Sequence, residues 1–174
     1  MKNRDHLKQK IREILDFPTT GVNFKDITPL LEDGRSFREA IDAMTEFFNR
    51  STVDKVVGID ARGFLFASAI AYNLNAGMVI VRKKGKLPYE TIIREHELEY
   101  GKGTLEMHKD AVLKNERIVV IDDVLATGGT AEAAVNLVEH LGGNVVGIGV
   151  LVELSSFGGR ERLKKYNVKS VIVY

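Results

Sequence analysis

Two apolar runs in the C-terminal half constrain the fold more than any other feature of the sequence. Residues 118–121 and 145–152 contain no polar side chain, as expected for strands that are buried on both faces of a parallel sheet. Residues 131–141 lie between them, favour a helix, and are followed by Gly142-Gly143, which would end it. A strand, a helix and a second strand in this order predict a parallel βαβ unit.

The same alternation extends through the rest of the chain. Further strands are expected at residues 53–59, 78–81 and 170–174, and a helix with small residues for close packing at 64–74. The 174 residues fit one ordinary domain. We therefore predict a single α/β domain, residues 1–174, with a mostly parallel central sheet flanked by helices.

The N-terminal part is expected to form a hood over this core, residues 1–35. Leu7, Ile11, Ile14 and Leu15 fall on one helical face, which predicts a first helix that ends near Asp16. A turn-rich segment follows. A second helix is expected to begin at about Ser36, a possible N-cap with Glu39 three positions later. Its buried stripe would consist of Phe37, Ile41, Met44 and Phe48.

Composition excludes several classes of function. The net charge is +1, so no overall field attracts nucleic acid or an anionic membrane, and we expect neither as a partner. The chain has no cysteine, which excludes disulfides and thiolate catalysis, and its four histidines have no metal-ligand spacing. The N-terminus is unlike a signal peptide, and no apolar run could cross a bilayer. We therefore expect a cytoplasmic protein.

One segment does not fit the alternation. The stretch RKKGKLPYETIIREHELEYGK, residues 82–102, is polar and separates two core strands. Long excursions of this kind often serve as lids over a site, so we predict a flexible lid loop, residues 82–107, inserted in the core. The alternative is a solvated hairpin without a role in function.

The sequence VVIDDVLATGGT, residues 119–130, is the strongest indication of chemistry. Ligands of open parallel sheets bind beyond the carboxyl ends of the strands, where Asp122 and Asp123 are expected. The glycines of the following loop allow close backbone approach, and its N–H groups and hydroxyls can bind an anion at a helix N-terminus. The predicted phosphate loop consists of Ala126, Thr127, Gly128, Gly129 and Thr130.

Two familiar phosphate motifs are absent. The chain has no G-x-x-x-x-G-K-[ST] run and no G-x-G-x-x-G run in this loop. A structural explanation remains, in which two acids end a strand and a threonine caps a helix. If the loop does bind phosphate, the carboxylates must face another group, because like charges repel. Sugar hydroxyls and the water molecules of a hydrated Mg²⁺ can both donate hydrogen bonds to carboxylates. A phosphorylated sugar therefore satisfies both parts of the motif.

At this point the sequence resembles a known family. VVIDDVLATGGT is similar to the phosphoribosyl diphosphate (PRPP) signature of the type I phosphoribosyltransferases. Five further segments, spread in order over nearly the whole chain, resemble the adenine phosphoribosyltransferase family: FPTTGVNFKDITPLL, GIDARGF, VRKKGKLP, LEYGKGTLEMHKD and LVELSSFGGRERL. The resemblance implies transfer of a 5-phosphoribosyl group from PRPP to adenine, giving AMP and diphosphate for purine salvage. It also implies Mg²⁺, held mainly by PRPP and water without direct protein ligands, and a homodimer.

The resemblance assigns further residues to the leaving diphosphate. Arg62 stands beside Gly63 at the end of a predicted strand, where its planar donor group suits diphosphate. An arginine that only pairs with a surface carboxylate is the alternative. The basic residues at the start of the excursion would, without the resemblance, be a solvated face. In the family the arginine of the VRKKGKLP segment, which is Arg82 in this sequence, reaches diphosphate, in part from the neighbouring subunit. The implied diphosphate-binding residues are Ala61, Arg62, Gly63, Arg82 and Lys86.

Catalysis and base recognition complete the implied site. With Arg62, Asp122 and Asp123, the resemblance implies Glu99 as a catalytic residue that exchanges a proton with the purine, although the sequence alone does not separate it from Glu95 and Glu97. The implied base-binding residues are Asn23, Phe24, Lys25 and Phe157. Asn23 and Lys25 stand where the family often has an apolar residue and an arginine. This departure is harmless if backbone atoms read the base, and otherwise it puts the identity of the base in doubt.

Two other functions are compatible with the signature. A PRPP-sensing transcriptional regulator would need an added helix-turn-helix and a basic face, and the N-terminal helix is too short for that module. A phosphoribosyltransferase for a 6-oxopurine would need a donor that reads the exocyclic oxygen, often a lysine.

Overall fold

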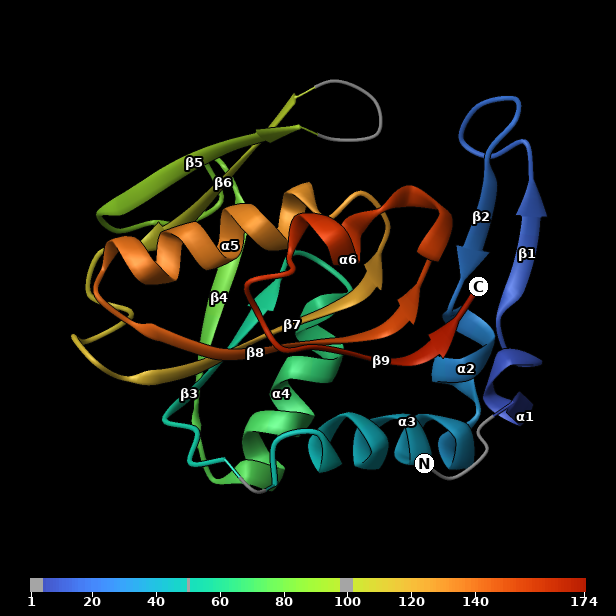
Figure 1. Cartoon of the computed structure of the whole chain (residues 1–174), viewed down its shortest axis with the longest axis horizontal. Helices are drawn as coiled ribbons and strands as arrows, with labels where there is room; N and C mark the ends of the chain where they lie inside the picture. Colours follow the sequence, from blue (N-terminus) through green and yellow to red (C-terminus); the bar gives the residue numbers. More distant parts are fainter. Residues whose placement is uncertain (1–4, 50, 98–101) are drawn as a thin grey trace.

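A seven-stranded sheet forms the centre of the molecule. The computed structural model describes residues 5–49, 51–97 and 102–174. The strand order is β5-β6-β4-β3-β7-β8-β9 (Figure 1). Five neighbouring strands are parallel: β4 (Gly77–Lys83), β3 (Lys55–Ile59), β7 (Arg117–Leu125), β8 (Asn144–Glu153) and β9 (Val168–Val173). The predicted α/β fold with a mostly parallel sheet is confirmed.

Helices cover both faces of the parallel strands. In Figure 1, α3 (Gly34–Glu46) and α4 (Gly63–Leu74) lie on one face, and α5 (Gly129–His140) and α6 (Gly159–Arg162) lie on the other. Two buried clusters result, one around Phe48, Phe66 and Ile70 and one around Leu137 and Val138. The apolar run of residues 118–121 lies between them and is fully buried, because its alternate side chains enter the two clusters. Among the described residues, no helix combines the length and apolarity that a membrane span needs.

The start of α3 differs from the prediction. Asp33, rather than Ser36, is the N-cap, and its carboxylate accepts a hydrogen bond of 2.8 Å from the backbone N–H of Ser36. Asp is an equally good N-cap, and it lies where the chain still has extended geometry. The predicted stripe is otherwise correct, since Ile41, Met44 and Phe48 are buried.

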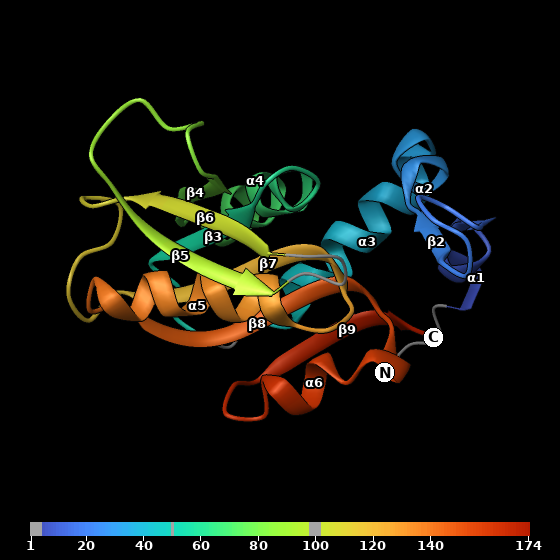
Figure 2. The same ribbon diagram turned by 90° about the horizontal axis from the view of Figure 1, so that it is seen from above.

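The N-terminal hood is only partly helical. Its elements are α1 (Asp5–Lys8), β1 (Arg12–Leu15), β2 (Asn23–Asp26) and α2 (Thr28–Glu32). The prediction of one helix up to Asp16 is wrong, because β1 pairs with β2 in an antiparallel ribbon that places Ile14 opposite Phe24. This pairing partner lies ten residues away, so the local periodicity did not reveal it. Figures 1 and 2 show the ribbon beside the carboxyl ends of β7, β8 and β9.

The predicted lid segment is largely an ordered hairpin. β5 (Thr91–Glu97) and β6 (Lys102–His108) pair in antiparallel fashion, and β6 joins the edge of β4 through Arg82 and Lys83. The hairpin therefore continues the central sheet instead of forming a loop over it. Glu99 lies outside the described residues.

Candidate active site

A pocket of about 1010 Å³ lies at the carboxyl ends of β3 and β7 and is also lined by residues of the hood. It brings together residues that were predicted from four separate segments. The predicted residues that line it are Asn23, Phe24, Lys25, Ala61, Arg62, Asp122, Asp123, Ala126, Thr127, Gly128, Thr130 and Phe157. Among the predicted residues that the structure describes, the others do not line it: Gly63, Arg82, Lys86 and Gly129.

The two acids lie side by side in the last part of β7. Asp123 is buried, and its backbone N–H donates a hydrogen bond of 2.9 Å to Oδ1 of Asp122. Burial of the carboxyl group raises the pKa of Asp122 well above its usual value, and the charge of Asp123 raises this pKa further. A nearby cation or hydrogen-bond donors would therefore stabilise the ionised form of this pair.

Arg62 supplies one such cation. Its Nε atom lies 2.5 Å from Oδ2 of Asp123, and this buried oxygen has no hydrogen-bond partner among the described residues apart from that ion pair. The guanidinium carbon of Arg62 also lies 5.3 Å from the ring centroid of Phe24. Arg62 thus connects the acid pair to the hood across the pocket.

A glycine explains how Arg62 comes so close to the acids. α4 begins at Gly63, and a side chain there would place its Cβ 2.9 Å from both Oδ1 of Asp122 and the carbonyl oxygen of Ile121. Only a residue without Cβ allows the first turn of α4 to pack against the end of β7. Gly63 therefore contributes close packing to the site.

The predicted phosphate loop connects β7 to α5. Gly128 has a φ of +82° and forms the N-cap of the helix, which places the following N–H groups at the helix N-terminus. The loop packs tightly on Gly159 of α6: a Cβ at Gly159 would lie 2.3 Å from the carbonyl oxygen of Ala126 and 3.0 Å from the amide nitrogen of Gly128. The position of the loop thus depends on a glycine 31 residues away in the sequence.

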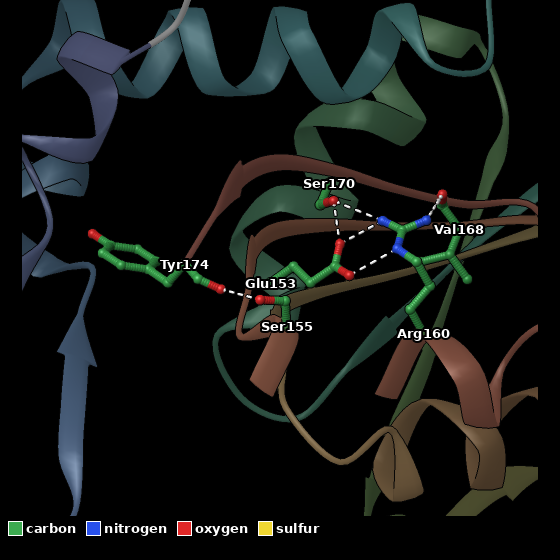
Figure 3. A network of polar contacts seen from close by, with 6 residues as sticks. All are labelled: Glu153, Ser155, Arg160, Val168, Ser170 and Tyr174. Carbon is green, nitrogen blue, oxygen red and sulfur yellow. Dashed lines mark hydrogen bonds and ion pairs between the residues drawn. The ribbon is translucent and has the colours of Figure 1, made fainter. Parts of the chain in front are cut away.

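A polar network fixes the segment that carries Gly159. Figure 3 shows the guanidinium of Arg160 against the carboxylate of Glu153, which is buried at the end of β8. Arg160 also donates to the carbonyl oxygen of Val168 (2.9 Å) and to the hydroxyl of Ser170 (3.0 Å). Hydrogen bonds from Arg160 outweigh the effect of burial and lower the pKa of Glu153. The network ties α6 to β8 and β9.

The side chains of the hood divide between two faces of β2. Asn23 Nδ2 donates to Glu13 Oε2 (3.0 Å), and Lys25 Nζ lies 2.8 Å from Glu13 Oε1. Phe24 faces the other way, with its ring in edge contact with Phe17 at 5.3 Å. The side chains of Asn23 and Lys25 are thus both engaged by Glu13.

Arg82 lies just outside the pocket and contacts its wall. Its Nε donates to Oδ2 of Asp60 (3.1 Å), a pocket residue, and its Nη1 donates to the carbonyl oxygen of Lys86 (3.0 Å). Glu106 accepts hydrogen bonds from the backbone N–H groups of Lys86 (2.7 Å) and Leu87 (2.8 Å) and so fixes this turn. The side chain of Lys86 itself is exposed.

Sequence reasoning missed several residues of the pocket. Asp60, Lys83, Leu154, Ser156 and Tyr174 line it as well. The run GIDARGF contains Asp60, and LVELSSFGGRERL contains Leu154 and Ser156, so the motifs did point to these regions. No local signal marks Tyr174, which reaches the pocket only through the position of β9 at the edge of the sheet.

Comparison with known proteins identifies the family of this chain. The model of the phosphoribosyl transferase domain matches residues 29–173. An adenine phosphoribosyltransferase from Caldicellulosiruptor bescii is 52% identical over 169 residues, which cover 97% of each chain. The chain belongs to the adenine phosphoribosyltransferase family.

Solved structures of this family have the same fold. The adenine phosphoribosyltransferase from Thermoanaerobacter pseudethanolicus has a TM-score of 0.95 and 48% identity, covering 98% of this chain and 99% of that one. The enzyme from Saccharomyces cerevisiae, solved with an imino-altritol bisphosphate and adenine, has a TM-score of 0.89 and 36% identity, covering 96% and 97%. The family resemblance seen in the sequence is therefore confirmed.

Proposed function

We propose that this chain transfers the 5-phosphoribosyl group from PRPP to adenine, giving AMP and diphosphate for purine salvage. The observation that carries this proposal is the convergence, in one pocket, of a glycine loop at a helix N-terminus, a buried acid pair, an arginine and an aromatic hood. Each of these four groups matches one part of the two substrates. Membership of the adenine phosphoribosyltransferase family supports the same reaction.

The phosphate loop and the acids would hold the ribose 5-phosphate. The backbone N–H groups near Gly128 and the hydroxyls of Thr127 and Thr130 suit the phosphate, with hydrogen bonds to a charged group contributing roughly 1.5–3 kcal/mol each. Asp122 and Asp123 are too negative to face that phosphate, so they would accept hydrogen bonds from the ribose hydroxyls. Their charge also favours the positive charge that develops on the ring.

Arg62 and its neighbours would hold the diphosphate. The guanidinium can bind two oxygens of a diphosphate with its planar donor array. Arg82 contacts Asp60 at the pocket wall, and the turn with Lys86 adds positive charge beside it. In the reaction a base nitrogen forms a bond to the anomeric carbon, and the bond from that carbon to the diphosphate oxygen breaks. The electron pair leaves with diphosphate, whose growing charge these residues would neutralise.

The hood would hold adenine. Phe24 and Phe157 both line the pocket and offer flat apolar faces for a heterocycle. The backbone groups of Asn23 and Lys25 can read its polar edge, since Glu13 occupies both side chains. The proton that the attacking base loses needs an acceptor, and we assign this role to Glu99. A carboxylate there would act best once the substrates exclude water.

Mg²⁺ fits this site as a partner of the substrate. No group of three or more His, Cys, Asp or Glu in the described parts of the chain could hold a metal alone. Asp122 and Asp123 nevertheless present carboxylate oxygens to the pocket, where they can accept hydrogen bonds from water on a hydrated ion. When bound, the ion would supply positive charge to the diphosphate.

A homodimer is supported by an apolar surface. Leu65 and Tyr72 on α4 are 45% and 86% exposed, and Met78 and Ile80 on the adjacent β4 are 38% and 36% exposed. Met78 lies on the α4 side of the sheet, because its methyl group is 3.4 Å from the Cβ position of Gly58, which also touches Ala67 of α4. An exposed apolar patch of this kind is typical of a protein interface.

The cytoplasmic location stays a prediction.

A competition assay tests the reaction. With PRPP and Mg²⁺ present, the protein is offered adenine, hypoxanthine, guanine and xanthine together, and the nucleotide products are separated by chromatography. We expect AMP as the dominant product. Turnover of only the three oxo-purines would refute the choice of base, and no nucleotide from any base would refute the reaction.

Analytical ultracentrifugation tests the dimer. The wild-type protein should sediment at twice the monomer mass, and Tyr72→Glu should shift it toward the monomer because a charge would enter the apolar patch. Glu32→Gln, on the hood helix α2 away from α4, is the control. A wild-type monomer at the concentrations of the activity assay would contradict the proposal.

A further inference from the structure

Tyr174 is fixed to the core by its backbone. Its N–H donates to the carbonyl oxygen of Glu153 (2.9 Å), and its carbonyl oxygen accepts from both the N–H (3.0 Å) and the hydroxyl (2.5 Å) of Ser155. Figure 3 shows the hydrogen bond from the Ser155 hydroxyl beside the Glu153–Arg160 network. The backbone of Tyr174 is thereby fixed to the segment that also carries Phe157.

The side chain of Tyr174 extends in the opposite direction. In Figure 3 its ring points away from the Glu153 network toward the hood. Two lysines of the hood contact it: Lys8 Nζ lies 4.0 Å and Lys25 Nζ 4.3 Å from the ring centroid. Ammonium groups at such distances are attracted to the negative face of an aromatic ring. Lys8 also donates to the carbonyl oxygen of Val173 (3.0 Å), so the hood and β9 are connected twice.

The charges around the ring explain why both lysines can gather there. Glu13 lies 2.8 Å from the ammonium group of Lys25 and accepts a hydrogen bond from Asn23. Lys25 is buried, so an unpaired ammonium would be unfavourable at this position. Glu13 therefore holds Asn23 and Lys25, the two residues that flank Phe24 in β2, and Tyr174 contacts one of them, Lys25.

We propose that Tyr174 is a positioning residue for the base end of the pocket. It holds β2 against the core so that Phe24 stands at a fixed distance from Phe157, which is carried by the segment that binds the backbone of Tyr174. The assignment to the base rests on the proposed function. In the described part of the chain, neither the phosphate loop nor the acid pair forms a hydrogen bond or ring contact with Tyr174, so the binding of PRPP should not depend on it.

Steady-state kinetics of Tyr174→Leu test the proposal. We expect the KM for adenine to rise on the order of tenfold, as the loss of two cation–π contacts allows, while the KM for PRPP stays within about twofold. Tyr174→Phe keeps the ring and should recover most of the affinity for adenine. Equal increases of both KM values, or a Phe variant as impaired as the Leu variant, would overturn the proposal.

Two further variants separate a local effect from a general loss of structure. Tyr166→Leu removes a tyrosine that binds Glu139 far from the hood, and it should leave the KM for adenine unchanged. Lys8→Met should raise this KM by a smaller factor, and in combination with Tyr174→Leu its effect should nearly vanish because the ring it contacts is gone. Fully additive effects of the two changes would contradict the contact between hood and ring. A wild-type protein that makes no AMP would refute the proposed function itself, and with it the assignment of Tyr174 to the base.

Discussion

Arg62 and Asp123 form an ion pair across the pocket, with 2.5 Å between Nε and Oδ2. The proposed function assigns the first residue to the diphosphate and the second to the ribose. The pair therefore joins the groups that act on the two sides of the bond that breaks. It also places a positive charge beside two adjacent carboxylates, which offsets part of the repulsion between them.

Asp123→Asn should lower kcat/KM by about two to three orders of magnitude, because a neutral amide no longer favours positive charge on the ribose ring. The fold should survive, since the two side chains have nearly the same shape. Asp110→Asn, an exposed aspartate away from the pocket, serves as the control. Initial rates and thermal unfolding check both variants. Wild-type activity in Asp123→Asn would show that the acid pair is structural.

Asp122→Asn should stabilise the protein at neutral pH and abolish most activity. Burial and the charge of Asp123 raise the pKa of Asp122 above its value in the unfolded chain, so the folded state resists its ionisation. Between pH 3.8 and the native pKa of Asp122 the native state binds more protons than the unfolded state, so stability falls as pH rises through this range. Below pH 3.8 the carboxyl group of Asp122 is protonated in both states and no longer destabilises the fold.

Urea unfolding of wild type and Asp122→Asn at pH 4 and pH 7.5 measures this effect. The variant should gain stability relative to wild type at the higher pH and gain less at the lower pH. Arg62 faces the same carboxylates, and its attraction for the charged form works in the opposite direction. A variant that is less stable than wild type at pH 7.5 would show that this attraction dominates.

The core of the fold and the centre of the site could be predicted because their signals are local. Continuous apolar runs marked β7 and β8, and the acid pair follows directly in the same strand. The carboxyl end of a parallel strand is a general binding position, so the chemistry of VVIDDVLATGGT could be inferred without coordinates.

The parts that escaped prediction depend on contacts between distant segments. Ile14 fits a helical face and a strand equally well, and its pairing with Phe24 decides between them. Gly159 gave no sign of its role, because its neighbour Ala126 lies 33 residues earlier in the chain. Tyr174 likewise contacts Lys8, at the other end of the sequence.

Glu106→Gln should loosen the turn beside Arg82. One carboxylate oxygen of Glu106, Oε1, accepts from two backbone N–H groups, those of Lys86 and Leu87, and the neutral oxygen of an amide forms weaker hydrogen bonds than an ionised one. We expect a loss of about 1–3 kcal/mol in the free energy of unfolding and a higher KM for PRPP, since Arg82 donates to the carbonyl oxygen of Lys86. Glu90→Gln, an exposed residue that pairs with Lys109, is the matched control. If stability falls and the KM for PRPP does not change, Arg82 has no part in binding diphosphate.

Gly159→Ala should displace the phosphate loop. The added Cβ would lie 2.3 Å from the carbonyl oxygen of Ala126, a distance that only a shift of the backbone can relieve. We expect the KM for PRPP to rise about tenfold, equivalent to about 1.4 kcal/mol, because the N–H groups around Gly128 would no longer converge on one phosphate. Gly158→Asn is the control, since that position has a φ of +73°, which Asn tolerates, and open space around its Cβ. Equal KM values for the two variants would mean that the loop adapts to the methyl group, and that its geometry is set from within β7 and α5 alone.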